Sequence, residues 1–94
     1  MGIILLVKHR VADFEAWKEV FDDTSQRRAH GYEGAVVYRD RSDPNVVFVM
    51  FKVADLEASK RHTRSFTIID GMAKAGVTAA PEFFYLEEAD VQTY

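Results

Sequence analysis

The sequence VADFEA at residues 11–16 and the sequence VADLEA at residues 53–58 are nearly identical and lie 42 residues apart. Each copy follows an apolar run that is typical of a strand, and precedes a stretch with helical spacing. Each contains an aspartate, Asp13 or Asp55, where the apolar run stops. An aspartate at this place accepts hydrogen bonds from the free N–H groups of the first helical turn. The repeat therefore predicts one strand–helix unit that the chain uses twice.

Glycines and turn residues divide the rest of the chain. Each predicted helix ends at a glycine, Gly31 or Gly76, which suits a left-handed cap. Turn residues at 42–45 separate two β-rich runs and predict a hairpin. The predicted elements are a strand at 3–9, a helix at 14–30, strands at 34–40 and 46–53, a helix at 56–75 and a strand at 82–87. This order predicts an α+β, ferredoxin-like βαββαβ fold: a four-stranded antiparallel sheet with two helices on one face, in a single domain that spans residues 1–94.

The composition excludes several classes of protein. The 94 residues carry a net charge of −3, which argues against a polyanionic partner such as a nucleic acid. The absence of cysteine excludes a disulfide scaffold, a thiolate metal site and a nucleophilic thiol. The longest apolar run, residues 3–7, is far shorter than the roughly 20 residues of a membrane helix, and too short for a signal peptide. We therefore expect a cytoplasmic protein with no membrane contact.

The strands carry more apolar surface than two helices can cover. The run 46–53 is apolar on both of its faces, and residues 83–86 are four consecutive apolar residues. A sheet with helices on one side needs only one apolar face. The second apolar face predicts a partner, and we expect a homodimer that packs sheet against sheet.

A resemblance to a known superfamily follows from motifs along nearly the whole chain. These are His9, VADF at 11–14, Trp17, Phe21, YRD at 38–40, DPN at 43–45 and DLEA at 55–58. The chain resembles the dimeric α+β barrel superfamily, especially its small members that are similar to antibiotic biosynthesis monooxygenases and polyketide cyclases. The resemblance implies a homodimer with a ligand cavity between sheet and helices. Members include cofactor-free oxygenases of aromatic polyketides, polyketide cyclases and haem-degrading enzymes, and the fold does not choose among these activities.

The repeat also predicts which side of the strands faces that cavity. An offset of 42 aligns His9 with Phe51, and it aligns Val11 with Val53. One face then carries Leu5, Val7, His9, Val11, Val47, Val49, Phe51 and Val53. We expect the helices to cover this more apolar face, which places His9 at the mouth of the cavity. We also expect both strand–helix junctions at the same end of the fold, so that His9 and Trp17 approach His62.

His62 is the first candidate for catalysis. It lies near the centre of the arc of the second helix that periodicity predicts to be buried, together with Ser59, Phe66, Ile69 and Ala73. Imidazole titrates near neutrality, so a partly buried histidine can act as a general base or acid. Deprotonation of an aromatic substrate would give a carbanion or phenolate that reacts with O₂ or closes a ring. The alternative is a core histidine bonded to a backbone carbonyl; His9 is the second catalytic candidate.

The remaining site candidates are predicted to bind the substrate. They are Phe14, Trp17, Phe21, Arg28, Tyr38, Phe66 and Met72. Arg28, Tyr38 and Trp17 can donate hydrogen bonds to a developing oxyanion, and the others can form apolar walls. The alternatives are a core role for Trp17 and a salt-bridged surface role for Arg28. Tyr38 fits either face of its strand, and we expect His30 to cap the first helix in solvent.

The sequence leaves one main alternative to an enzyme. The histidines lack clustered metal-ligand spacing, so we predict no metal and no cofactor, with haem binding through one histidine as a lesser alternative. Residues 44–51 lack the basic residue, glycine and first aromatic of an RNA-recognition motif. The preferred hypothesis is a small cofactor-independent monooxygenase or cyclase with an aromatic or polyketide-like substrate. The alternative is a non-catalytic ligand-binding or regulatory homodimer of the same fold.

Overall fold

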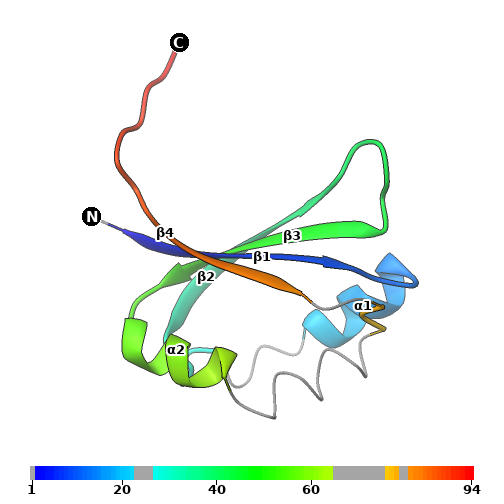
Figure 1. The fold of residues 1–94 in the computed structure, drawn as a ribbon, viewed down its shortest axis with the longest axis horizontal. Helices are drawn as coiled ribbons and strands as arrows, with labels where there is room; N and C mark the ends of the chain where they lie inside the picture. The colour runs from blue at the N-terminus through cyan, green and yellow to red at the C-terminus, as the bar shows by residue number, and fades with distance from the viewer. Residues whose placement is uncertain (1, 23–26, 65–75, 79–80) are drawn as a thin grey trace.

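A four-stranded antiparallel sheet with two helices on one side forms the body of the computed structural model (Figure 1), which describes residues 2–22, 27–64, 76–78 and 81–94. The elements are β1 (Ile3–Arg10), α1 (Phe14–Phe21), β2 (Tyr32–Arg39), β3 (Val46–Val53), α2 (Leu56–Thr63) and β4 (Glu82–Glu87). The strand order is β2-β3-β1-β4. The predicted βαββαβ fold is confirmed.

Both helices begin at the aspartates that the repeat singled out. A carboxylate oxygen of Asp13 accepts a hydrogen bond from the Ala16 N–H at 3.1 Å, and Asp55 accepts one from the Ala58 N–H at 3.1 Å. Each aspartate is extended, so it closes the strand side of the junction and opens the helix. The local sequence therefore determines where both helices start.

The first helix ends earlier than predicted. It stops at Phe21, and residues 27–31 form a turn in which the Tyr32 N–H donates to the Arg27 carbonyl. The predicted helix over 14–30 is therefore too long, although Gly31 does have the predicted positive φ of 90°. The last part of the second predicted helix, residues 65–75, lies outside the described residues.

Gly31 has a tertiary role that its sequence context did not show. Its carbonyl accepts hydrogen bonds from the N–H groups of Ala54 at 2.8 Å and Asp55 at 3.2 Å. A Cβ atom on Gly31 would lie 2.4 Å from the Asp55 carbonyl oxygen. Only glycine allows the start of β2 to pack this closely against the start of α2.

The predicted inner face of the sheet is confirmed. The register pairs Leu5 with Phe51, Val7 with Val49 and His9 with Val47, so these side chains share one face. Seven of the eight predicted inner residues are buried, and Phe51 is half-buried. Both helices pack on this face.

The predicted position of the strand–helix junctions is wrong. Strands β1 and β3 are antiparallel, with Ile3 opposite Val53 and Arg10 opposite Val46. The chain therefore leaves β1 for α1 at one end of the sheet and leaves β3 for α2 at the other end (Figure 1). Because β1 and β3 are antiparallel, the two strand–helix repeats are related by a rotation that places their junctions at opposite ends of the sheet. His9, at the first junction, is therefore separated from His62 in α2.

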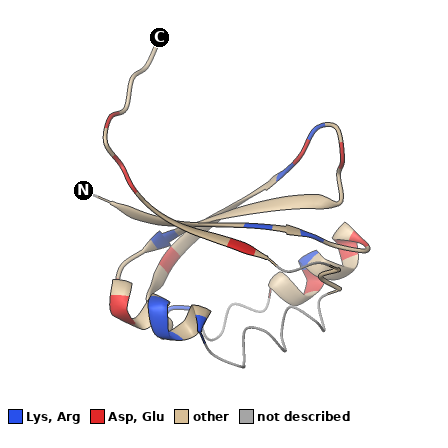
Figure 2. Ribbon diagram, in the orientation of Figure 1, with Lys and Arg blue, Asp and Glu red and all other residues tan. Residues whose placement is uncertain are grey.

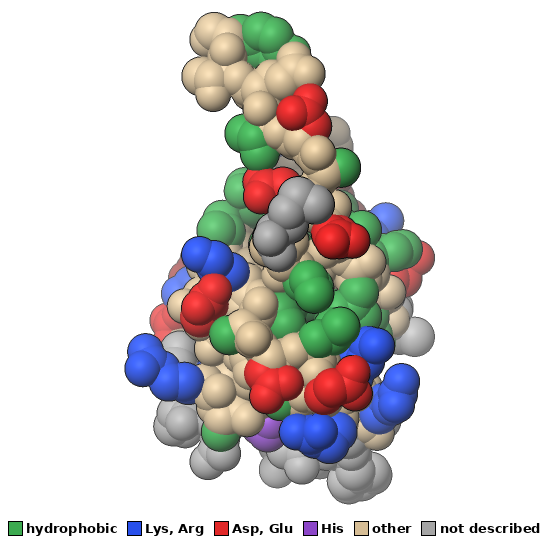
Figure 3. Space-filling view, turned by 90° about the vertical axis from the view of Figure 1, so that its left-hand side faces the viewer, with side chains coloured by type: hydrophobic (Ala, Val, Ile, Leu, Met, Phe, Trp, Pro, Cys, Tyr) green, Lys and Arg blue, Asp and Glu red, His purple; other side chains and the backbone are tan. Residues whose placement is uncertain are grey.

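The opposite face of the sheet is apolar, and neither α1 nor α2 covers it. Its side chains, here called the open face, are those of Ile4, Leu6, Val36, Tyr38, Phe48, Met50, Phe84 and Leu86. Val36 and Tyr38 are each 51% exposed. Charged residues lie mainly toward the strand ends and on the helices (Figure 2). Residues 88–94 extend beyond the sheet, above a surface on which apolar side chains gather between charged ones (Figure 3).

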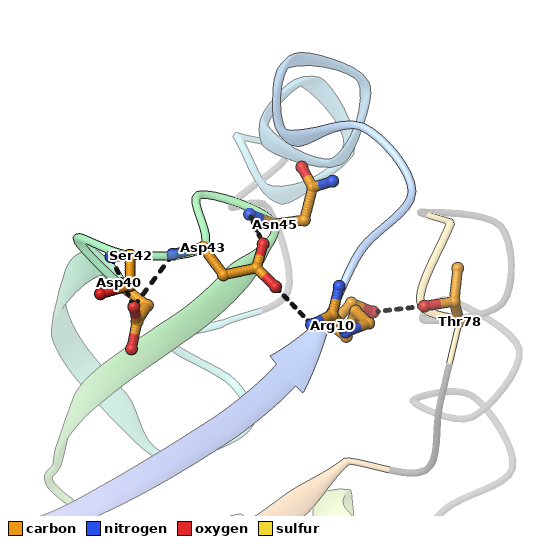
Figure 4. A network of polar contacts seen from close by, with 6 residues as sticks. All are labelled: Arg10, Asp40, Ser42, Asp43, Asn45 and Thr78. Carbon is orange, nitrogen blue, oxygen red and sulfur yellow. Dashed lines mark hydrogen bonds and ion pairs between the residues drawn. The ribbon is translucent and has the colours of Figure 1, made fainter.

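A polar network fixes the hairpin between β2 and β3 (Figure 4). The Asp40 carboxylate accepts hydrogen bonds from the Ser42 N–H at 2.7 Å and the Asp43 N–H at 3.0 Å. Asp43 forms an ion pair with Arg10 at the end of β1, and the Arg10 carbonyl accepts a bond from the Thr78 hydroxyl at 3.3 Å. The hairpin is thereby attached to the central strand and to the segment before β4.

Replacement of Gly31 by alanine should destabilise the fold by about 2–5 kcal/mol. The left-handed backbone contributes about 1–2 kcal/mol of this loss, and the clash with Asp55 contributes about 1–3 kcal/mol. Gly76→Ala is the matched control, because Gly76 also has a positive φ of 83°, but a Cβ atom there would meet no atom of the described chain within 4 Å. Urea denaturation should show a clearly larger loss for Gly31→Ala; equal losses would contradict the close approach.

Candidate functional site

A continuous row of rings runs along the helix-covered face from one strand–helix junction to the other. Successive centroids in this aromatic row lie 5.3 Å apart for His9–Trp17, 4.8 Å for Trp17–Phe21, 6.2 Å for Phe21–Phe51, 4.5 Å for Phe51–Tyr32, 5.7 Å for Tyr32–His62 and 4.0 Å for His62–His30. The middle of the row is apolar, and each end is polar. The polar groups that could act on a ligand therefore lie at the two ends of the aromatic row.

The first end is a buried histidine that makes no hydrogen bond within the described chain. His9 is 6% exposed, and neither Nδ1 nor Nε2 has a hydrogen-bond partner there. Its ring lies against Trp17, which is 4% exposed. Burial lowers the pKa of His9 to about 4, so the imidazole is neutral at pH 7. A buried polar atom without a partner destabilises the fold, so a contribution to stability does not explain His9 at this position.

The second end is a histidine–tyrosine pair. The Tyr32 hydroxyl lies 3.3 Å from Nδ1 of His62. Burial lowers the pKa of His62 to about 4, with smaller contributions from His30 and Arg27. Burial also raises the pKa of Tyr32, so the hydroxyl stays protonated at neutral pH. With this low pKa, His62 is neutral at pH 7. Its side chain is only half-buried, so it remains partly accessible to solvent.

A cavity of about 410 Å³ adjoins the second end. It lies between the end of α1 and the start of β2, and is lined by Phe21, Asp22, Arg27, Arg28, Tyr32, Glu33, Gly34 and Ala35. Tyr32 belongs both to this lining and to the pair with His62. The Arg27 guanidinium lies 3.7 Å from the Phe21 ring centroid and also bonds to the Phe21 carbonyl. The cavity thus combines an aromatic wall, a protonated tyrosine, two cations and two carboxylates.

The structure divides the predicted site residues between these places. Phe14 and Trp17 lie with His9, and Phe21 and Arg28 line the cavity near Tyr32. Tyr38 lies on the open face, so it is separated from every helix-covered candidate. Phe66 and Met72 lie outside the described residues.

The two histidines do not meet. His9 pairs with Val47, whereas Tyr32, the partner of His62, pairs with Val53 at the other end of β3. Six residues along a strand correspond to about 20 Å. No single reacting atom can therefore contact both imidazoles.

Sequence reasoning missed the polar groups around His62. Ser59 was assigned to the buried arc of the helix, but its hydroxyl lies 3.0 Å from the Tyr32 hydroxyl and 2.8 Å from that of Tyr85. His30 was expected to cap a helix in solvent; instead it is half-buried and stacks on His62. The one signal available was that Ser59 and His62, three residues apart on one helix, were both polar in an apolar arc.

Neither a metal site nor a membrane span is found in the part of the chain that the structure describes. No three His, Asp or Glu side chains there lie close enough together to hold a metal ion. None of the described helices is long and apolar enough to cross a membrane.

Comparison with known proteins identifies the fold. No protein-family model and no curated protein sequence matches the chain. Among solved structures, a putative antibiotic biosynthesis monooxygenase from Bordetella bronchiseptica has a TM-score of 0.72 at 12% identity, covering 95% of this chain and 99% of that one. A second from Caulobacter crescentus has a TM-score of 0.67 at 20% identity, covering 95% and 91%.

A third similar structure is SnoaB, a cofactor-independent oxygenase from Streptomyces nogalater. Its TM-score is 0.70 at 17% identity, covering 96% of this chain and 95% of that one. At these identities the likeness shows the fold alone. The resemblance that the sequence suggested is therefore confirmed at the level of the fold.

Replacement of His9 by leucine should stabilise the protein by about 1 kcal/mol or more, because it removes two buried polar atoms that make no hydrogen bond within the described chain. His62→Leu is the control; it should destabilise, since it leaves the Tyr32 hydroxyl without its histidine partner. Thermal denaturation at pH 7.5 measures both. A lower melting temperature for His9→Leu would show that the imidazole has a stabilising partner.

The His9→Leu variant should lose less stability than the wild type when the pH is lowered. The pKa of His9 is about 4 in the folded state against 6.5 for a free histidine, so only the unfolded chain takes up this proton between those values. Stability that is complete above pH 6.5 is therefore lost as the pH falls toward 4. Urea denaturation at pH 7.5 and pH 5 should give a smaller difference for His9→Leu than for the wild type; parallel losses would contradict a neutral His9.

Proposed function

We propose that the protein is a small cofactor-independent enzyme, of monooxygenase or cyclase type, that acts on an aromatic or polyketide-like substrate on the helix-covered side of the sheet. The observation that carries this proposal is the hydrogen-bonded pair of His62 and Tyr32 beside the 410 Å³ cavity. The cavity supplies room for a ligand beside Tyr32, and the acid–base group, His62, contacts this lining residue through the Tyr32 hydroxyl.

The lining of the cavity suits a planar substrate with an ionisable oxygen. Phe21, whose ring is stacked on Trp17 and lies under the Arg27 guanidinium, offers an apolar wall, and Arg28 offers a cation to a phenolate or enolate. Oxygenation and ring closure both need a proton to leave the substrate and an oxyanion to be stabilised. SnoaB, which has the same fold, is a cofactor-independent oxygenase, and this supports the reaction class.

His9 is the second catalytic candidate in this proposal. Its two nitrogens, which no described group of the chain contacts by a hydrogen bond, can bind a polar group of a ligand that enters between α1 and the sheet, with Trp17 and Phe14 as walls. Since the two ends are about 20 Å apart, variants at each end distinguish which one acts on the substrate. Retained turnover in His9→Leu would exclude His9 as the catalytic group.

Loss of the His62 imidazole should reduce turnover about 100-fold or more, in the range of general acid–base catalysis. His62→Gln and Tyr32→Phe are assayed against a panel of hydroxylated polycyclic aromatics by O₂ uptake and product mass. Tyr94→Phe is the matched control for Tyr32→Phe, because Tyr94 is fully exposed in the C-terminal segment. Ligand binding without any product, unchanged in His62→Gln, would instead support the non-catalytic ligand-binding protein.

We also propose that the active form is a homodimer that packs through the open face. The eight apolar side chains of this face form rows across all four strands, and no element of the described chain covers them. Residues 88–94 extend to the same side of the sheet (Figure 1). Burial of such a face against a second copy removes a large apolar patch from water.

A charge on the open face should break this dimer. Val36→Lys introduces a lysine at a residue that is 51% exposed on that face, and native mass spectrometry should show mainly monomer. Val20→Lys is the control; Val20 is 44% exposed on α1 and should leave the dimer intact. A wild-type monomer, or equal effects of the two lysines, would contradict the sheet-to-sheet interface.

A further inference from the structure

We infer that Ser59 and Tyr85 complete a hydrogen-bonded relay that supplies protons to His62 from solvent, so that this histidine transfers protons without becoming charged. The inference rests on the proposed function, because it assigns positioning roles around the proposed acid–base group. It concerns residues of three different elements, β2, α2 and β4, of which Tyr32 lines the cavity and the others connect to Tyr32 by hydrogen bonds, directly or through Ser59.

The relay consists of four side chains in sequence. Ser59 is fully buried, with its hydroxyl 2.8 Å from the Tyr85 hydroxyl and 3.0 Å from the Tyr32 hydroxyl. The Tyr32 hydroxyl is in turn 3.3 Å from Nδ1 of His62. Tyr85 is 36% exposed, and its hydroxyl also lies 3.4 Å from that of Thr63. One end of the relay therefore reaches the surface and the other ends at the imidazole.

The hydrogen bonds have one consistent direction. Each hydroxyl has one hydrogen to donate. Ser59 donates to Tyr32, and Thr63 donates to the Lys60 carbonyl, so neither can donate to Tyr85. The one hydrogen of Tyr85 points to Ser59, which at 2.8 Å is closer than Thr63 at 3.4 Å. Tyr32 is then free to donate to Nδ1 of His62. The direction from Tyr85 to His62 requires Nδ1 to be an acceptor, and so places the ring hydrogen on Nε2.

This arrangement explains how a histidine with a low pKa can serve as an acid. The pKa of His62 is about 4, because burial and the nearby positive charge disfavour the imidazolium. For a substrate whose oxyanion lies at Nε2, the Nε2–H bond would break as an O–H bond forms on that oxyanion. At the same time each group of the relay passes its proton one step toward the imidazole. Tyr32 gives its proton to Nδ1, Ser59 gives its proton to Tyr32, and Tyr85 gives its proton to Ser59. Tyr85 then takes a proton from water, and the buffer neutralises the hydroxide that remains. The imidazole stays neutral throughout.

The completed transfer reverses the relay, and the reversed form is a base. Nδ1 then holds the hydrogen and Nε2 holds the lone pair. Nε2 can take a proton from the next substrate while Nδ1 returns its proton through Tyr32 and Ser59 to Tyr85. The two proton transfers that oxygenation and cyclisation need, one from carbon or phenol and one to an oxyanion, would thus use the same four side chains.

The first test needs no substrate. Long-range ¹H–¹⁵N NMR at pH 7 should show His62 of the wild type with its hydrogen on Nε2 and a hydrogen-bonded Nδ1. Ser59→Ala should shift the Nδ1 resonance, because Tyr32 loses the donor that orients its hydroxyl, whereas Ser59→Thr keeps a hydroxyl and should retain the wild-type signal. A wild-type hydrogen on Nδ1, or an unshifted Nδ1 in Ser59→Ala, would overturn the relay.

The second test uses turnover and separates the relay from the proposed function. Tyr85→Phe preserves the ring but removes the hydroxyl at the solvent end, and should lower kcat at least tenfold while leaving KM within about twofold. Tyr94→Phe, a tyrosine in the exposed C-terminal segment, is the matched control. If His62→Gln abolishes turnover but Tyr85→Phe and Ser59→Ala have wild-type kcat, the relay is wrong and the enzyme assignment stands. If turnover is independent of His62, the proposed function fails by itself.

Discussion

The antiparallel pairing of β1 with β3 is the constraint on which the rest of the structure depends. It sets Leu5 opposite Phe51 and His9 opposite Val47, and so gathers the apolar face that both helices cover. It also sends the two strand–helix junctions to opposite ends of the sheet. The aromatic row runs between those ends, and its two polar termini are separated because the strands run in opposite directions.

Burial then determines the chemistry at each terminus. Both imidazoles have a pKa of about 4, yet they differ in their partners: His9 has none within the described chain, while His62 faces a chain of hydroxyl groups. A neutral imidazole with hydrogen-bond partners can transfer protons along them. One without partners is poised for a ligand or destabilises the fold. The same physical cause, desolvation, therefore leads to different roles at the two ends.

The two faces of the sheet have different roles. The helix-covered face carries the candidate site, and the open face carries apolar side chains that no element of the described chain covers. Gly31 links the site to the fold, because its carbonyl accepts hydrogen bonds from the N–H groups of Ala54 and Asp55, just before α2. The turn that holds Gly31 also holds Arg27 and Arg28, which line the cavity. Backbone geometry and the cavity lining are consequently set by one short segment.

The sequence by itself determined the local features: the two aspartate caps, the strands at 46–53 and 82–87, the face to which each inner strand residue belongs, and the apolar excess of the open face. These follow from patterns within one element, where a period of two or a capping side chain acts over a few residues. Only the tertiary structure decided that Tyr32, Ser59 and Tyr85 meet His62, that Tyr38 faces away, and that His9 and His62 stay apart. Those relations depend on the rotation between strands far apart in the chain, and no local periodicity records that rotation.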